Sequence, residues 1–236
     1  MRLKVLGSGS KGNCYVLQGE KETLLLEGGI NYKEILKGLD FNISNVSCLI
    51  SHEHKDHSKA LQELLNNGID VYTGMETAKG QVHYRLKFIK AGEQFNMNEF
   101  IILPFDLQHD VPNLGFLIQH PEIGKLIYLT DTYYCKYKFN SLNCIMIECN
   151  YSKEILDENL YSGNLIPVLR DRIVESHFSL ENVKEFLKAN DLSQVKNIVL
   201  LHLSDGNSNA EQFKQDIEAL TGIPTYIAVK GLEIEL

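Results

Sequence analysis

Histidine is concentrated in one short run of this chain, Ser51–His57, which reads Ser-His-Glu-His-Lys-Asp-His. It follows an apolar segment that predicts a strand, Val46–Ser51, and precedes a segment with helical spacing, Ser58–Asn67. The chain has only 8 histidines and three of them fall in this run, so a solvated loop with histidines by chance explains it poorly. The run therefore predicts a metal site at the end of a strand.

The order of the ligands within this run suggests how they divide. Side chains alternate along an extended chain, which places His52 and His54 on the same side. The chain must then turn before the helix begins near Ser58, and this turn redirects Asp56 and His57. One short segment can give two imidazoles to one metal ion, and a carboxylate and an imidazole to its neighbour. Imidazole together with carboxylate suits zinc, manganese or iron better than calcium.

Two metal ions need more ligands than this run contains. The further candidates are His109, Asp131 and His202, each at or near the carboxyl end of an apolar segment that predicts a strand. The sheets of α/β proteins place their sites at these ends. Taken singly, each residue is more readily explained as structural; taken with the histidine run, they supply the missing ligands.

The rest of the sequence predicts one domain, residues 1–236, with strands before helices in each half and no linker between the halves. This order favours an α/β fold of four layers, αββα, in which two mixed sheets pack face to face and helices cover them. The predicted strands are Leu3–Leu6, Asn13–Gln18, Thr23–Glu27, Val46–Ser51, a segment near Val71, Leu86–Ile89, Phe100–Phe105, Leu114–Gln119, Lys125–Thr130, Cys144–Glu148, Asn197–Leu203 and Thr225–Val229. The predicted helices are Asn31–Leu39, Ser58–Asn67, Ile155–Asn159, Ile166–Glu175, Leu180–Ala189 and Asn209–Leu220.

A glycine-rich segment, Gly7–Gly12, matches the G-x-G-x-x-G pattern of dinucleotide-binding folds. That mechanism requires a helix to begin after the third glycine, so that its N-terminus can hold a pyrophosphate. A strand pattern follows instead, from Asn13 to Gln18. We therefore interpret the segment as a tight loop between strands, which can line a substrate cleft with backbone amides.

Composition limits the class of protein. The formal net charge is −8, which argues against a broad electrostatic surface for nucleic acid but does not exclude that substrate, because two divalent ions would add positive charge inside a cleft. The 5 cysteines include no CxxC pair, and their odd number favours free, buried thiols in a reducing compartment. No apolar run approaches the roughly 20 residues of a membrane span, and the N-terminus lacks a signal-peptide core. We expect a cytoplasmic protein that does not contact membranes; the sequence leaves open whether it forms a homo-oligomer.

The histidine run, followed by His109, Asp131 and His202 in that order, resembles the metallo-β-lactamase superfamily over the whole chain. Four further motifs are similar to the WalJ/YycJ-type branch, whose members are regarded as metal-dependent phosphodiesterases or DNA exonucleases. These motifs are Gly7–Cys14, Thr130–Thr132, Glu148-x-Asn150 and Leu201–Ser204.

The resemblance implies a site for two divalent metal ions, zinc or manganese. One ion would be bound by His52, His54 and His109, and the other by Asp56, His57 and His202, with Asp131 as the bridge. Such a centre attacks a phosphodiester with an activated water. The catalytic residues implied are Asp56, Asp131 and His177. The last of these corresponds to a further histidine of the branch, which would protonate the leaving oxygen or bind the phosphate; as a loop histidine beside a helix cap it has an equally plain structural reading.

Two positions depart from the family pattern. The first acidic motif has Glu27 where an aspartate is usual, and the branch usually has a histidine at Tyr151, which makes Tyr151 a candidate neighbour of the cleft. The acid normally supports the histidine loop through hydrogen bonds, so the longer side chain implies a local adjustment. The remaining histidines, His83 and His120, are expected at the surface. The chain is also too short for the inserted domain of larger nucleases or for a separate substrate-binding arm.

Three functions remain. The first is a metal-dependent phosphodiesterase with nuclease activity, whose substrate is DNA, RNA or a nucleotide. The second is a hydrolase of a small substrate such as a cyclic nucleotide, a thioester or a lactone. The third is a binding protein that keeps the fold without turnover, against which the complete set of ligands argues.

Overall fold

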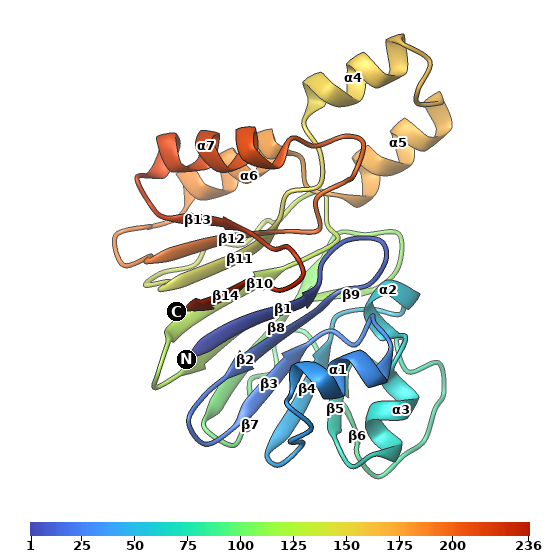
Figure 1. The fold of residues 1–236 in the computed structure, drawn as a ribbon, viewed down its shortest axis with the longest axis vertical. Coiled ribbons are helices and arrows are strands. Elements are labelled where there is room, and N and C mark those ends of the chain that lie inside the picture. Colours follow the sequence, from blue (N-terminus) through green and yellow to red (C-terminus); the bar gives the residue numbers. More distant parts are fainter.

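The computed structural model describes residues 1–236 and contains two seven-stranded sheets. One sheet has the order β14-β1-β2-β3-β4-β5-β6, and the other has the order β13-β12-β11-β10-β9-β8-β7. In each sheet antiparallel pairs occupy one end and parallel pairs the other. The two sheets face each other and helices lie outside them (Figure 1), which confirms the predicted four-layer αββα fold.

The strands of the first sheet are β1 (Arg2–Gly7), β2 (Cys14–Gln18), β3 (Thr23–Leu26), β4 (Val46–Ile50), β5 (Asp70–Thr73), β6 (Leu86–Phe88) and β14 (Glu233–Glu235). Those of the second sheet are β7 (Phe95–Met97), β8 (Phe100–Leu107), β9 (Asn113–His120), β10 (Gly124–Leu129), β11 (Cys144–Glu148), β12 (Asn197–Leu201) and β13 (Thr225–Ile227). The helices are α1 (Tyr32–Gly38), α2 (Lys55–Ser58), α3 (Leu61–Asn66), α4 (Lys153–Tyr161), α5 (Pro167–Ser176), α6 (Leu180–Ala189) and α7 (Ala210–Thr221).

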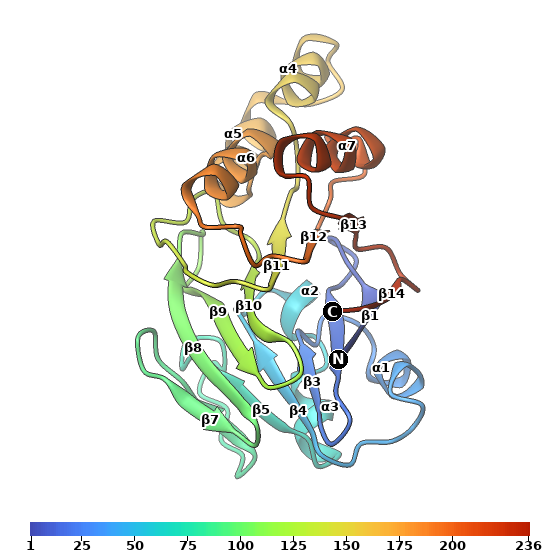
Figure 2. The ribbon, with the colours of Figure 1, turned by 90° about the vertical axis from the view of Figure 1, so that its left-hand side faces the viewer.

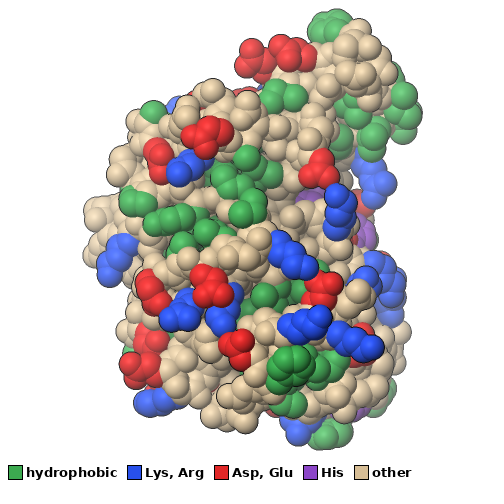
Figure 3. All heavy atoms as spheres, in the orientation of Figure 1, with side chains coloured by type: hydrophobic (Ala, Val, Ile, Leu, Met, Phe, Trp, Pro, Cys, Tyr) green, Lys and Arg blue, Asp and Glu red, His purple; other side chains and the backbone are tan.

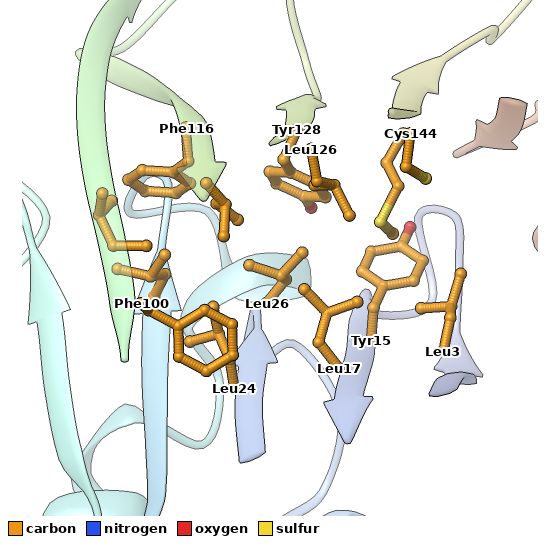
Figure 4. Packing of buried hydrophobic residues seen from close by; sticks show 14 of the residues in the cluster. Leu3, Tyr15, Leu17, Leu24, Leu26, Phe100, Phe116, Leu126, Tyr128 and Cys144 are labelled. Carbon is orange, nitrogen blue, oxygen red and sulfur yellow. The ribbon is translucent and has the colours of Figure 1, made fainter. Parts of the chain in front are cut away.

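The main core lies between the sheets. Leu17, Leu24 and Leu26 from the first sheet point toward Phe116 and Leu126 from the second (Figure 4), and all are fully buried. Burying apolar surface in this way is the dominant favourable contribution to folding. This core fixes the two sheets relative to each other, and so it fixes the loops at their common edge.

Separate apolar layers lie beneath the outer helices. On the first sheet, Ile35 of α1 and Leu64 of α3 pack into one of these layers; on the second, Phe186 of α6 and Phe213 of α7 pack into another. Helices α4 and α5 differ, because they form a hairpin that projects beyond the second sheet (Figures 1 and 2). The sequence predicts both helices, but it does not predict that they project from the sandwich.

One local prediction needs correction, and two short strands are absent from the predicted set. The helix predicted from Ser58 is two short helices, and the first begins at Lys55, inside the histidine run. The Ser58 hydroxyl donates to the carbonyl oxygens of Glu53 and His54, which closes this tight turn. The two short strands β7 and β14 are not predicted from the sequence, and β14 returns from the second half of the chain to pair with β1.

Two smaller points concern cysteines and helix length. All five cysteines are free and buried, as expected. None of the helices has both the length and the apolar character needed to span a bilayer.

Candidate metal centre and active site

The predicted ligands come together at one edge of the sandwich, where strands from both sheets end. His52, His54, His109 and Asp131 form a first group, and Asp56, His57, Asp131 and His202 form a second. Within each group, one ligand atom from every residue lies within 4.8 Å of all the others. Asp131 is common to both groups, which is the arrangement a bridging carboxylate requires.

Strand ends position these side chains. The histidine run follows β4, His109 follows β8, Asp131 follows β10 and His202 follows β12. The backbone at Asp131 and at His202 has a φ of 49° and 52°, in the left-handed region that non-glycine residues rarely adopt. The Asn113 side chain donates to the Asp131 carbonyl at 2.7 Å, and the Asn150 side chain donates to the His202 carbonyl at 2.8 Å. Surrounding hydrogen bonds thus hold an unfavourable backbone in place, as is common at functional sites.

The glycine-rich segment contributes to the same edge. It is a loop between β1 and β2, as predicted, and its Asn13 backbone N–H donates to the Asp56 carbonyl at 2.7 Å. The side-chain amide nitrogen of Asn13, Nδ2, lies 3.0 Å from Nε2 of His57. Gly29 lies beneath this contact, where a Cβ atom would overlap the Asp56 carbonyl oxygen. Glycine at this position therefore lets the histidine run pack directly on the loop.

Glu27 supports the histidine run from the core. It is fully buried; its Oε2 accepts from the Ser51 N–H at 3.2 Å, and its Oε1 accepts from the Tyr128 hydroxyl at 3.2 Å. Oε1 also lies 3.5 Å from Nδ1 of His57. The backbone at Glu27 has a φ of 69°, in the left-handed region. Glu27 thus contacts the histidine run in the way the resemblance implies for the usual aspartate.

The free ring nitrogens test whether a metal fits. Nδ1 of His109 donates to the Ser176 carbonyl at 3.1 Å, and Nδ1 of His202 lies 3.1 Å from the Glu148 carboxylate. Metal-binding histidines commonly donate their second nitrogen in this way, which leaves the first nitrogen free to bind the ion. Nε2 of His52 and Nε2 of His202 are buried without a hydrogen-bond partner. Because buried polar atoms are rarely left unpaired, these atoms fit a bound cation.

Electrostatics favour the same interpretation. Burial would raise the pKa of Asp131, but the imidazoles of His202 and His57 outweigh it and hold that pKa well below its usual range. Burial would lower the pKa of His202, but Asp131 and Asp56 outweigh it and raise the pKa to about 10. Burial does lower the pKa of His52. The buried carboxylates require positive charge beside them, which either an imidazolium or a divalent cation supplies.

His177 joins the centre through a carboxylate. Its Nδ1 lies 2.6 Å from Oε1 of Glu148, and the same oxygen lies 3.1 Å from Nδ1 of His202. The other oxygen of Glu148 accepts from the backbone N–H groups of Thr132 and Phe178, so both carboxylate oxygens have hydrogen-bond partners. Burial would lower the pKa of His177, but Glu148 outweighs it and raises that pKa. Nε2 of His177 has no partner in the protein, and the ring borders the cleft.

The centre opens into a cleft of about 350 Å³ that contains no hydrophobic lining residue. The lining residues are Ser10, His54, Lys55, Asp56, His109, Asp110, Asp131, Arg172, Ser176, His177 and His202. Lys55 lies inside the histidine run, but the sequence does not predict Lys55, Asp110 or Arg172 as site residues. Their neighbours in sequence, His109 and the predicted helix at Ile166–Glu175, offered the only available signal.

Two expected positions are wrong. Tyr151 does not line the cleft: it is 1% exposed and packs against Leu156 and Leu165 at the base of the α4–α5 hairpin, and burial raises its pKa to about 12. His120 is not at the surface but is 1% exposed, with Nε2 lying 3.4 Å from Glu22. The position of His120 before a turn suggested exposure, but Phe100 and Glu22 pack against its ring.

His120, Glu22 and Glu99 form another group of potential ligands, at the opposite end of β9 from the cleft. Nδ1 of His120 accepts from the Glu122 backbone N–H at 3.2 Å. A neutral imidazole that accepts at Nδ1 carries its proton on Nε2, which therefore faces Glu22 as a donor. A nitrogen that carries a proton has no lone pair for a cation, so Nε2 of His120 faces the Glu22 carboxylate as a donor group and not as a metal ligand.

Sequence comparisons identify relatives along most of the chain, although no family model matches it. The exodeoxyribonuclease YycJ of Bacillus anthracis is 27% identical over 235 residues, which cover 92% of this chain and 88% of the relative. The exodeoxyribonuclease WalJ of Streptococcus pneumoniae is 28% identical over 230 residues, which cover 89% and 84%. The resemblance to the WalJ/YycJ-type branch is therefore confirmed.

Solved structures show the same fold. The metallo-β-lactamase fold protein YhfI of Bacillus subtilis matches with a TM-score of 0.73 at 14% identity, over 99% of each chain. Zinc-bound PqqB of Methylobacterium extorquens matches with a TM-score of 0.73 at 12% identity, over 100% of each chain. Human tRNase Z, short form, matches with a TM-score of 0.65 at 17% identity, over 100% of this chain and 99% of the other. The expected fold is confirmed by these structural matches.

Proposed function

We propose that this protein, a metal-dependent hydrolase with the metallo-β-lactamase fold, is a dinuclear phosphodiesterase that cleaves nucleic acid. The observation that supports a dinuclear centre best is the pair of ligand groups that share Asp131. The proposed ligands of one ion are His52, His54, His109 and Asp131, and those of the other are Asp56, His57, Asp131 and His202. Two divalent ions bound there would activate water and stabilise the charge of a phosphodiester in its transition state.

The chain's own residues supply the remaining chemistry. Glu148 orients His177 through Nδ1 and keeps its imidazole basic, so that Nε2 faces the cleft ready to give a proton. We assign His177 the role of general acid toward the leaving oxygen. Only polar and charged side chains line the cleft. Such a lining suits a phosphate and the attacking water better than an apolar acyl group. The two curated relatives are both named exodeoxyribonucleases, and this supports nucleic acid as the substrate.

A substrate panel tests the proposal. The holoenzyme is offered bis(p-nitrophenyl) phosphate, a single-stranded DNA oligonucleotide, an RNA oligonucleotide, a cyclic nucleotide, a thioester and a lactone. We expect turnover of the phosphodiesters with the oligonucleotides as the preferred substrates. Turnover restricted to the thioester or the lactone would refute the phosphodiesterase, and turnover restricted to the cyclic nucleotide would refute nucleic acid as the substrate.

A further inference from the structure

We propose that Arg172 and Lys55, on the two walls of the cleft, bind phosphate groups that flank the reacting phosphate, and that they make the enzyme specific for polynucleotides over isolated phosphodiesters. This inference rests on the proposed function. Arg172 and Lys55 would contact the substrate outside the proposed metal centre and would determine specificity. It also gives the strand a direction, from the cleft outward along α5.

Arg172 is the arginine of this chain that no carboxylate neutralises. Of the other three, Arg2 pairs with Glu235, Arg85 with Asp70 and Arg170 with Asp171. Arg172 is exposed and has no hydrogen bond or ion pair to the protein, although Asp171 is its neighbour in sequence. Its guanidinium instead borders the cleft that contains the metal ligands. An unpaired guanidinium there suits a phosphate, which it can bind with two parallel hydrogen bonds.

Lys55 provides the matching cation on the other wall. It is the first residue of α2, lies between two ligands of the histidine run, and is exposed without an ion-pair partner. It lines the same cleft as Arg172, but it comes from the first half of the chain, whereas Arg172 comes from the second. Figure 3 shows Lys and Arg side chains around the histidine atoms that are visible at one edge of the molecule. In a chain with a net charge of −8, free cations at this edge favour an anionic polymer over a neutral substrate.

The surface of α5 continues beyond Arg172 in a way that suits a strand of nucleic acid. Ser176 lies four residues after Arg172 and Val168 four residues before it, so that the three share one face of the helix. Ser176 and Arg172 line the cleft, while Val168 is 78% exposed toward the tip of the hairpin. The rise of an α-helix makes this face about 12 Å long. A cation beside the cleft with an apolar contact beyond it matches the alternation of phosphate with sugar and base along a strand.

The test compares two substrates in four variants of the metal-loaded enzyme. Arg172→Ala and Lys55→Ala remove the proposed contacts. Arg170→Ala and Lys59→Ala are the controls, because each removes a nearby charge that does not line the cleft; Lys59 is exposed and Arg170 is half-buried. One substrate is a single-stranded DNA pentamer, which has flanking phosphates, and the other is bis(p-nitrophenyl) phosphate, which has none.

We expect Arg172→Ala and Lys55→Ala each to lower kcat/KM for the pentamer about tenfold, the usual effect of losing one charge-assisted hydrogen bond. The values for bis(p-nitrophenyl) phosphate should fall much less than those for the pentamer, and both controls should match the wild type on both substrates. Arg172→Lys should restore part of the loss. Equal losses on the two substrates, or no loss on the pentamer, would overturn the inference and leave the proposed function standing.

A binding measurement separates contact from indirect effects. The affinity of each variant for a fluorescent, phosphorothioate-linked single strand is measured by anisotropy at several salt concentrations. Each lost phosphate contact should reduce the slope of log affinity against log salt by about 0.7. An unchanged slope in Arg172→Ala would overturn the assignment. If the wild-type enzyme hydrolyses bis(p-nitrophenyl) phosphate but neither cleaves nor binds the strand, the proposed nucleic-acid function itself is wrong and the inference falls with it.

Discussion

Nδ1 of His177 lies 2.6 Å from Oε1 of Glu148, a carboxylate that is fully buried and also contacts His202. This pair connects the proposed general acid to a proposed metal ligand through a single oxygen atom. It fixes the imidazole so that Nε2, the nitrogen without a protein partner, is the one available to the substrate. The position of His177 is therefore set by the same group that contacts a proposed ligand of the metal centre.

The first prediction concerns His177. His177→Ala should lower kcat on an oligonucleotide by about 10²- to 10⁴-fold, the range for losing a general acid. The loss should be much smaller with bis(p-nitrophenyl) phosphate, because nitrophenolate leaves readily without a proton. Steady-state kinetics on both substrates measure the difference.

His83→Ala is the matched control, because it makes the same change in a histidine outside the cleft. The metal content of both variants should equal that of the wild type. A His177→Ala enzyme that loses metal, or that loses equal activity on both substrates, would contradict the role of His177 as a proton donor.

The sequence predicts most of the fold because its central strands and longer helices carry clear patterns. For β11 the expected bounds, Cys144–Glu148, are those observed. The strands that escape prediction are β7 and β14, each of three residues, and β14 has a single apolar residue between two glutamates. Such a segment becomes a strand because β1 offers it an unpaired edge, and this is a tertiary effect that local pattern does not contain.

The candidate site divides in the same way. Its proposed ligands are predictable because they combine a dense local motif with residues at strand ends. Arg172 is not predictable, since only the packing of α5 decides which face of that helix borders the cleft. The burial of His120 is also a tertiary effect, because the residues that cover it are distant in sequence. The centroid of the Phe100 ring lies 4.4 Å from that of His120, and Glu22 also contacts the imidazole.

The second prediction concerns removal of metal. Elemental analysis of the protein should find close to two zinc or manganese ions per chain. Dialysis against a chelator should lower Tm by about 5 to 10 °C, because a ligand at about 100 times its Kd contributes roughly 2.7 kcal/mol. Calorimetry before and after dialysis, and again after zinc or manganese is restored, measures the change. A Tm that does not respond to chelator or to added metal would count against the proposed centre.

The third prediction concerns Asp131, the residue common to both ligand groups. Asp131→Ala should reduce turnover at least about 10³-fold, because both ions would lose a shared ligand. Ions bound at such a site stabilise the charge of the transition state by several kcal/mol. Metal content should fall below that of the wild type, while the circular dichroism spectrum should remain that of a folded protein. Asp106→Ala, which removes an exposed carboxylate on β8, is the control and should change neither quantity. Full activity in Asp131→Ala would refute the bridging role.

The fourth prediction concerns Tyr151, which the structure places in the core under α4 and α5 and not in the cleft. Tyr151→Ala should lower the free energy of unfolding by about 3–5 kcal/mol, the usual effect of deleting a buried aromatic ring. Tyr151→Phe keeps the ring and removes only the hydroxyl, so it should lower the free energy of unfolding by no more than about 0.5–1.5 kcal/mol and should leave kcat and KM near the wild-type values. Urea denaturation gives the stabilities, and kinetics on the DNA pentamer give the activities. A Tyr151→Phe enzyme with normal stability but greatly reduced kcat would mean that the hydroxyl reaches the reacting groups, contrary to its buried position.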